Sequence, residues 1–390
     1  MDFAAAGLLD GLEGDERAAR VELLERLAAD GFTLQQLKGA VAEQRLALLP
    51  LERVLGGQYT AVEIAQRTGV PAELLVRIRR LLGLPASGPE DRVFTEEDAA
   101  AAESTRMFLE AGLGEDAIAE ITRVLGEAMS RVAASSMAGF ADAFLQPGDS
   151  EQDVAWRFAE LAEQLVPAVS PVLLSAYKGH LRENVQRGVL SRAELEAGHI
   201  VGEQETAVCF ADMVGFTTLG AEIEAEELGG VIGRFGELAS DAASSQVRLV
   251  KTIGDAAMLT SREPEPLVGA ALSLLEAAEE ADLPSLRAGV ALGSALARAG
   301  DLYGHAVNLA SRVTAIARPG SVLCTKELRD AAPDAYDWSF AGRHRLKGIG
   351  DSVPLYRARR LAAAIADGGS GEDERSSRQK ASRRRRRAAS

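Results

Sequence analysis

The spacing of apolar residues changes once along the chain, near residue 200, and this change constrains the fold more than any other feature. Before it, apolar residues recur at helical intervals, as Val21, Leu24 and Leu27 do on one face. After it, short apolar runs alternate with helical stretches. Because strands repeat every two residues and helices every 3.6, the two parts need different architectures. The sequence therefore predicts an all-α domain over residues 1–198 and an α+β domain over residues 199–360.

The order of elements in the second part narrows its topology. The predicted strands are 207–211, 247–253, 286–292, 321–324 and 352–356, and the predicted helices are 221–245, 264–281 and 305–317. Gly254 and Asp255, in the middle of residues 250–259, predict a β-hairpin. The order β-α-β-β-α-β is typical of a ferredoxin-like core. Beyond residue 360, Gly, Ser and Arg prevail, which predicts a disordered basic tail over 361–390.

The net charge of −15 is an average over unlike parts. From Arg375 onward there are eight basic residues and no acids, so residues 1–374 carry 35 bases, 58 acids and a net charge of −23. A body of this charge repels bulk nucleic acid, and we do not expect nucleic acid as a partner. The arginine run within 382–387 is read as solvated, with contact to anionic lipid or nucleic acid, or to the acidic body, as alternatives.

Several classes of protein are excluded by composition. Two cysteines cannot build a disulfide framework, and four histidines leave little for a His/Cys metal cage. The N-terminus shows no basic stretch followed by a long apolar one. The uncharged stretch 164–177 is too short to span a bilayer and contains Pro167 and Pro171. We expect a reduced, cytoplasmic protein.

Three segments of the second part carry candidate chemistry. In the first, Asp212 ends an apolar run and precedes a glycine loop, which suits a divalent cation and a polyphosphate but is also a common way to end a strand. In the second, Lys251 is one of only six lysines and lies four residues before Asp255, although a plain hairpin turn is the simpler interpretation. In the third, Asn308 and Arg312 lie one helical turn apart, where a polar helix face is the alternative.

Together these segments resemble the catalytic domain of class III nucleotide cyclases, over about residues 204–359. The resemblance implies that Asp212 and Asp255 bind two Mg²⁺ or Mn²⁺ ions, with the backbone carbonyl of Met213 as a further ligand. It also implies that backbone N–H groups of one loop wrap the β and γ phosphates: Gly215, Phe216 and Thr217.

The same resemblance assigns five further side chains. Lys251 and Asp301 correspond to the pair that selects adenine, and Asn308 and Arg312 to the pair that acts in the transition state. Lys347 corresponds to a late phosphate-binding lysine. None of these positions departs from the family's pattern, and the Gly-Gly-Asp/Glu-Glu-Phe signature of diguanylate cyclases is absent.

The implied activity is an adenylate cyclase that converts ATP to 3′,5′-cyclic AMP and pyrophosphate. Two cations would offset the charge of the triphosphate while the ribose 3′-OH attacks the α phosphorus in line. The family implies a homodimer in which Asp212 and Asp255 come from one protomer and four side chains come from its partner: Lys251, Asp301, Asn308 and Arg312. The alternative function is a DNA-binding regulator with a catalytically inactive, nucleotide-sensing domain.

That alternative depends on residues 59–84, which resemble a helix-turn-helix. Thr60 is predicted to cap the first helix, Gly69 to form the turn and Pro71 to open the second helix. Arginines on the second helix would suit DNA, but the acidic surroundings favour a helical pair that only packs within its domain.

The first part as a whole resembles the helical regulatory domain that precedes the catalytic domain in some actinobacterial cyclases. This resemblance implies autoinhibition, with protons or a lipid as the input. A linker helix over about 175–198 would transmit the state. His180 and His199, near its two ends, titrate near neutral pH when unperturbed, although isolated histidines are often passive.

Overall fold

The computed structural model describes residues 1–186 and 203–361. The chain forms two compact units, Met1–Glu196 and Ala197–Ser390. The predicted tail, His199 and the end of the predicted linker helix lie outside the described residues. Within these residues no helix is both long and apolar enough to cross a membrane.

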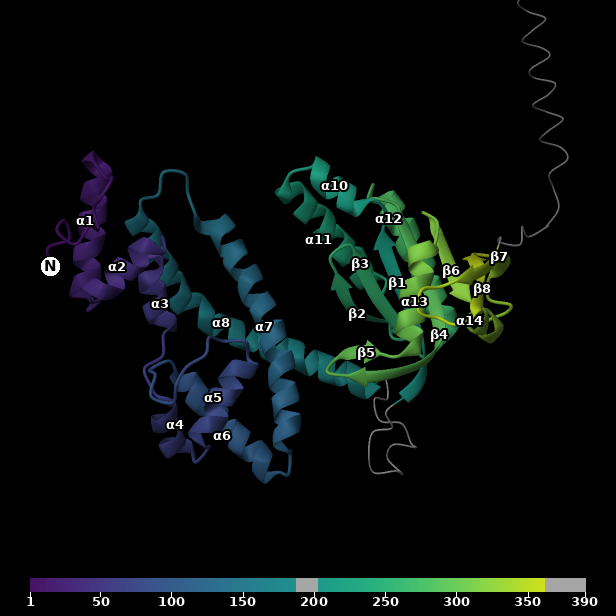
Figure 1. The fold of residues 1–390 in the computed structure, drawn as a ribbon, viewed down its shortest axis with the longest axis horizontal. Coiled ribbons are helices and arrows are strands. Elements are labelled where there is room, and N and C mark those ends of the chain that lie inside the picture. Colours follow the sequence, from purple (N-terminus) through teal and green to yellow (C-terminus); the bar gives the residue numbers. More distant parts are fainter. Residues whose placement is uncertain (187–202, 362–390) are drawn as a thin grey trace, which may run out of the picture. The chain divides into compact units, whose positions relative to one another are not determined.

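The first unit is helical (Figure 1). Its α-helices are α1 (Gly14–Ala29), α2 (Leu34–Ala42), α3 (Leu49–Leu55), α4 (Ala61–Thr68), α5 (Ala72–Leu81), α6 (Glu96–Glu110), α7 (Glu115–Phe144) and α8 (Glu151–Gln186), with a 3-10 turn, η1, at Leu46–Leu48. The apolar face that the sequence places on α1 is fully buried at Leu23, Leu24 and Leu27. This face forms one cluster with α2, η1 and the start of α8, as expected of amphipathic helices.

The helix pair α4 and α5 is built from local capping signals. Thr60 accepts a hydrogen bond from the N–H of Glu63 while the Glu63 side chain accepts one from the N–H of Thr60, a capping box. Gly69 ends α4 at a φ of 76°, and Pro71 precedes α5. Two of the arginines on α5 contact the rest of the unit: Arg77 forms an ion pair with Glu115 and Arg79 lies over the ring of Phe94.

The second unit is a mixed sheet with helices on both faces (Figure 1). Its strands are β1 (Glu203–Met213), β2 (Arg248–Ile253), β3 (Ala256–Ser261), β4 (Leu286–Arg298), β5 (Asp301–Tyr303), β6 (Ser321–Thr325), β7 (Asp337–Arg345) and β8 (Ser352–Arg359). Its helices are α10 (Phe216–Glu222), α11 (Ala225–Asp241), α12 (Pro264–Glu280), α13 (His305–Ile316) and α14 (Lys326–Ala331).

The sheet order confirms the ferredoxin-like core. The strands run in the order β2-β3-β1-β4, and the chain passes through β1, α11, β2, β3, α12 and β4, the predicted β-α-β-β-α-β series. Beyond this core, β6 joins β4 in parallel, and β8 and β7 follow in antiparallel pairing. The short strand β5 pairs with the end of β4. The fold class expected from the sequence, helical first and α+β second, is confirmed.

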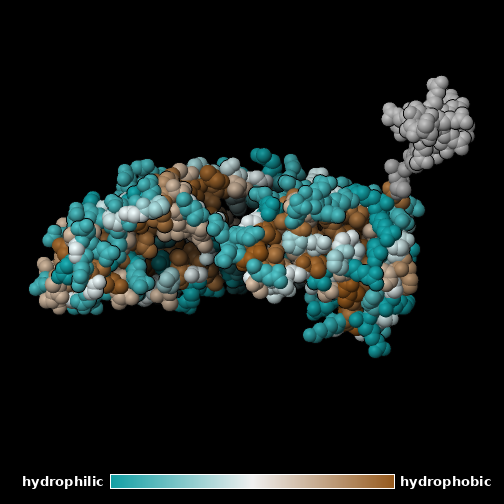
Figure 2. All heavy atoms as spheres, turned by 90° about the horizontal axis from the view of Figure 1, so that it is seen from above, coloured by the Kyte–Doolittle hydropathy of each residue, from teal (hydrophilic) through white to brown (hydrophobic). Residues whose placement is uncertain are grey.

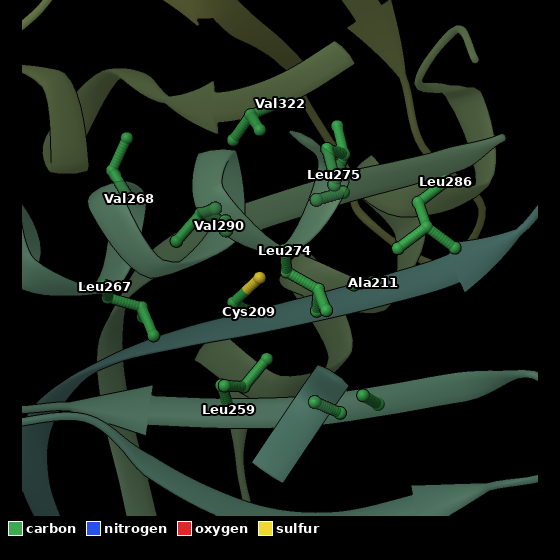
Figure 3. Close-up of a cluster of buried hydrophobic side chains, with 14 of the residues drawn as sticks. Cys209, Ala211, Leu259, Leu267, Val268, Leu274, Leu275, Leu286, Val290 and Val322 are labelled. Carbon is green, nitrogen blue, oxygen red and sulfur yellow. The ribbon is translucent and has the colours of Figure 1, made fainter. Parts of the chain in front are cut away.

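The sheet is buried on both faces. On one face, α11 and α12 cover a large cluster that includes Cys209, Leu259 and Leu274 (Figure 3). Burial raises the pKa of the Cys209 thiol to about 12, so this cysteine packs in the core and does not act as a nucleophile. On the other face, α13 covers a second cluster. It approaches β4 so closely that a Cβ at Gly289 would lie 2.2 Å from the backbone nitrogen of Thr314.

The sequence did not predict every element. β5 has only three residues, and β7 is an edge strand with an irregular burial pattern, so neither carries a clear period-2 signal. The short helices α10 and α14 were missed for the same reason of length. β4 extends six residues beyond its predicted end at Leu292, because its far part pairs with both β1 and β5.

Candidate active site

Asp212 and Asp255 meet at one end of the sheet. Asp212 lies near the end of β1, opposite Ala256 of β3. The N–H of the next residue, Met213, donates to the carbonyl of Asp255 at 3.0 Å. Asp255 itself lies in the β2–β3 turn beside Gly254, whose φ of 58° suits glycine. The antiparallel ladder therefore brings together two aspartates that are 43 positions apart in the chain.

Arg287 holds the carboxylate of Asp212. It lies directly opposite Asp212 on β4, and its Nε and Nη2 donate to Asp212 Oδ2 at 2.9 and 2.6 Å. Its Nη1 donates to the carbonyl of Ala315 on α13 at 3.2 Å. No sequence pattern marks Arg287, because its contact with Asp212 follows from the pairing of β1 with β4. The positively charged guanidinium of Arg287 therefore lies beside the Asp212 carboxylate in the folded chain.

The donor set at this end of the sheet consists of oxygen atoms. Two carboxylates and the carbonyl of Met213 are hard ligands of the kind that Mg²⁺ and Mn²⁺ prefer. Among the described residues there is no cluster of three or more His, Cys, Asp or Glu side chains. Two carboxylates and one carbonyl suit Mg²⁺, because this ion usually keeps several waters in its shell.

The loop after β1 offers backbone donors. Val214 donates to the carbonyl of Ser285 at 2.9 Å, which fixes the start of the loop. Gly215 precedes α10 at a φ of 78°, and its carbonyl accepts from the N–H groups of Thr218 and Leu219. The N–H groups of three residues make no backbone hydrogen bond within the described chain, as is normal where a helix begins: Gly215, Phe216 and Thr217.

Lys251 and Asp301 form an ion pair through Lys251 Nζ and Asp301 Oδ2. Their side chains are 36% and 24% exposed, so the pair remains accessible. A bulge at Val250 makes the contact possible: Leu249 pairs with Leu259, but Lys251 pairs with Met258. A bulge turns the following side chain to a new direction, and here it turns Lys251 toward β5.

The position of Asp301 depends on a tight turn. Arg298 on β4 pairs with Asp301 on β5, with Ala299 and Gly300 between them at φ values of 54° and 78°. Arg248 of β2 donates from Nη2 to the carbonyl of Gly300 at 3.0 Å. β2 therefore contacts the β4–β5 hairpin twice, through Arg248 and through Lys251.

Asn308 and Arg312 lie on the exposed face of α13. The helix starts after Gly304, whose φ is 135° and where a Cβ would lie 2.9 Å from the carbonyl oxygen of Ser294. No hydrogen bond or ion pair joins Asn308 or Arg312 to Asp212 within the described residues. Lys347 is also exposed, in the loop between β7 and β8, next to buried Leu346. Within the described residues, backbone pairing thus brings Asp212 and Asp255 to one end of the sheet and an ion pair joins Lys251 to Asp301, whereas Asn308, Arg312 and Lys347 are joined to neither pair.

Comparison with known proteins agrees with this architecture. Residues 1–185 match the adenylate cyclase regulatory domain, and residues 201–356 match the adenylate and guanylate cyclase catalytic domain. The fold and these matches define a nucleotide cyclase. The chain belongs to the adenylate cyclase family in which a helical regulatory domain precedes the catalytic domain.

The relatives share this organisation over most of the chain. The chain is 39% identical to the pH-sensitive adenylate cyclase MT1302 of Mycobacterium tuberculosis, over 94% of each protein. It is 32% identical to an adenylate cyclase of Streptomyces coelicolor, over 72% of this chain and 74% of that protein. Among solved structures, the adenylyl cyclase CyaB of P. aeruginosa matches 42% of this chain and 98% of its own, with 20% identity and a TM-score of 0.37.

Proposed function

We propose that the chain converts ATP to 3′,5′-cyclic AMP and pyrophosphate. The observation that supports adenine rather than guanine as the base of the substrate is the ion pair between Lys251 and Asp301. Lys251 would donate to a ring nitrogen of adenine, and Asp301 would accept from its 6-amino group. Guanine would present its O6, an acceptor, to the Asp301 carboxylate. An unpaired buried acceptor costs about 1–3 kcal/mol, so adenine would be favoured by roughly tenfold or more.

Asp212, Asp255 and the carbonyl of Met213 would hold two Mg²⁺ or Mn²⁺ ions. When bound, such ions lower the pKa of the ribose 3′-OH and offset the charge of the triphosphate. Because Arg287 occupies the Asp212 carboxylate in this structure, cation binding requires that ion pair to loosen. The guanidinium would then be free to meet phosphate oxygens beside the same carboxylate, where a positive charge favours them.

The reaction would be an in-line displacement. The 3′ oxygen attacks the α phosphorus, the bond to the oxygen bridging the α and β phosphorus atoms breaks, and pyrophosphate leaves with that oxygen while the hydroxyl proton passes to solvent. Arg312 would stabilise the charge that gathers on the phosphoryl oxygens, and Asn308 would orient the ribose. Lys347 and the N–H groups of Gly215, Phe216 and Thr217 would bind the β and γ phosphates.

A homodimer would complete the site. Among residues 1–186 and 203–361, no hydrogen bond or ion pair links Asn308 or Arg312 to Asp212 or Asp255, and this observation supports a second protomer. A two-fold axis would place Asp212 and Asp255 of one protomer against four residues of its partner and would form two equivalent sites. The four are Lys251, Asp301, Asn308 and Arg312.

The helical unit would regulate the site in the cytoplasm. It would restrain the catalytic dimer until a proton or a lipid changes its state. His180 lies on α8, the last described helix before the catalytic unit, which supports a role for this helix in transmitting the state.

Product analysis tests the proposed activity directly. The full chain is incubated with ATP or GTP and Mg²⁺ or Mn²⁺, and the nucleotides are separated and identified. Cyclic AMP is expected as the main product. Asp301→Ala should lower the preference for ATP over GTP by about tenfold to a hundredfold, because the acceptor for the 6-amino group is lost. Cyclic GMP as the main product of the parent chain, or no product with either metal, would refute the proposal.

A further inference from the structure

A basic hollow lies on the catalytic unit at the same end of the sheet as Asp212, beside β6 and β8. It has a volume of about 360 Å³ and lies between α12, the turn before β6 and the end of β8. Four arginines line it, Arg318, Arg357, Arg359 and Arg360, with Glu276 as the only acid. This concentration of positive charge contrasts with the net charge of −23 on residues 1–374.

The hollow lies at the same end of the sheet as Asp212, because Ser321 in its lining pairs with Arg287 of β4, but its helix lies on the face opposite α13. Leu272 and Glu276 belong to α12, which covers the face with Cys209. Asp212 alternates along β1 with Ala211 and Met213 of that face, and its partner Arg287 reaches α13 on the opposite face. In addition, β4 and β6 separate β1 from β8. The hollow is therefore a neighbour of the candidate active site, centred on β6 and β8 rather than on β1.

Arg318 lies in a turn whose backbone is held by hydrogen bonds. Arg318, Pro319, Gly320 and Ser321 form a tight turn in which the Ser321 N–H donates to the Arg318 carbonyl at 3.1 Å. Proline in the second position and a glycine at φ 67° in the third are the residues that a type II turn requires. The Ser321 hydroxyl donates to the same carbonyl at 2.7 Å, and the Gly320 N–H donates to the carbonyl of Leu286 at 2.8 Å.

The hollow carries more positive than negative side chains, four arginines against one glutamate. Arg360 is neutralised, since its Nε donates to both oxygens of Glu276 at 2.9 and 3.2 Å and its Nη2 donates to Ser273 Oγ. Across the described chain, no hydrogen bond or ion pair engages the side chains of Arg318, Arg357 and Arg359. The Nε of Arg357 is buried with no acceptor. A buried donor without an acceptor is unfavourable, so an acceptor placed beside this atom would stabilise it.

We propose that this hollow binds a small molecule with a diphosphate or triphosphate group. Guanidinium groups match phosphate oxygens with paired N–H donors, and three uncompensated arginines suit a ligand of several negative charges. The volume lies near the lower end of the range for small-molecule pockets, about 300–1,000 Å³. Inorganic pyrophosphate and the diphosphate of a nucleotide share this chemistry. The apolar side chains of Leu272 and Pro319 in the lining favour a nucleotide.

Calorimetric titration of the full chain tests the site. Inorganic pyrophosphate and ADP are titrated separately in the presence of EDTA, so that metal-dependent binding at the active site is removed. One diphosphate is expected per chain. Arg318→Gln and Arg359→Gln should each weaken binding by about tenfold or more, because each removes a charged donor. Tighter binding of ADP than of pyrophosphate would identify the nucleotide as the ligand, and equal affinity would identify the diphosphate alone.

Two variants with the same substitution act as controls. Arg312→Gln removes an arginine of the candidate active site, and Arg234→Gln removes an exposed arginine of α11. Both should bind like the parent chain, and circular dichroism should show that all four variants are folded. The proposal is overturned if the parent binds neither probe, if Arg318→Gln and Arg359→Gln bind as the parent does, or if Arg312→Gln abolishes binding. Because no turnover is measured, its failure is separate from failure of the proposed activity.

Discussion

The two units of the chain bury their apolar residues in different ways. In the catalytic unit, a central sheet is covered on both faces, and its two clusters include residues with no exposed surface, such as Phe235 and Val313. In the helical unit, the buried residues form three smaller clusters, and apolar side chains stay on the surface of α7 and α8 (Figure 2). Val172 and Val185 are 65% and 78% exposed.

This difference separates a rigid part from an adaptable one. Pairing of β3 with β1 and with β2 sets the positions of Asp212 and Lys251 and of the turn that holds Asp255. Long helices with few buried contacts along their length change their packing at lower cost. The contrast fits the proposal that the sheet carries the catalytic residues and the helices regulate them.

The largest expected effect concerns the cores themselves. Phe235→Ala should lower the free energy of unfolding of the catalytic unit by about 3–5 kcal/mol, because it leaves a cavity in a fully buried site. Val185→Ala, on the exposed side of α8, should change stability by less than about 0.5 kcal/mol. Urea unfolding measures both, with Trp338 reporting on the catalytic unit and Trp156 on the helical unit. A loss above about 2 kcal/mol for Val185→Ala would mean that α8 is covered in solution.

The next prediction tests whether each active site needs residues from two protomers. Asp212→Ala and Asn308→Ala should each lower turnover by roughly 10²–10³-fold, because each removes a group that acts on the reacting phosphate or ribose. If sites are shared, an equal mixture of the two variants should recover roughly a quarter of the parent activity, from heterodimers with one intact site. Light scattering shows whether dimers form. Inactive mixtures of proven dimers would contradict the shared site.

A smaller effect tests the control exerted by the helical unit. Residues 200–360 alone should produce cyclic AMP about 5–150 times faster than the full chain, the range expected from a coupling free energy of 1–3 kcal/mol. Rates are compared over a series of pH values with the same substrate and metal. Equal rates at every pH would remove the proposed restraint and leave α7 and α8 without this role.

The smallest effect concerns a contact within the sheet. Arg248→Met removes the hydrogen bond to the carbonyl of Gly300 and should lower the preference for ATP over GTP by about fivefold, in line with about 1 kcal/mol for such a bond. Arg248→Lys retains a donor and should restore most of the preference. Arg234→Met, on α11, serves as the matched control and should leave the ratio of kcat/KM values unchanged. An unchanged ratio in Arg248→Met would show that the hairpin holds Asp301 without this contact.

Local signals were sufficient for much of the fold. The switch in apolar spacing predicted the helical and α+β parts, and the Gly254-Asp255 pair predicted the β2–β3 turn. The family assignment was also correct, because the polar residues that identify this family lie at characteristic spacings from each other and from these turns. The roles of those residues stay predictions.

What the sequence alone determined is therefore the class of each unit, the order of the main strands and the identity of the family. What only the tertiary structure decided depends on pairing between distant segments. Arg287 contacts Asp212 because β4 lies beside β1, and Lys251 reaches Asp301 because a bulge at Val250 shifts the register. The arginine-lined hollow likewise joins α12, the turn at Pro319 and the end of β8. Apolar periodicity is a local property, whereas register and the meeting of charges are set only when the sheet assembles.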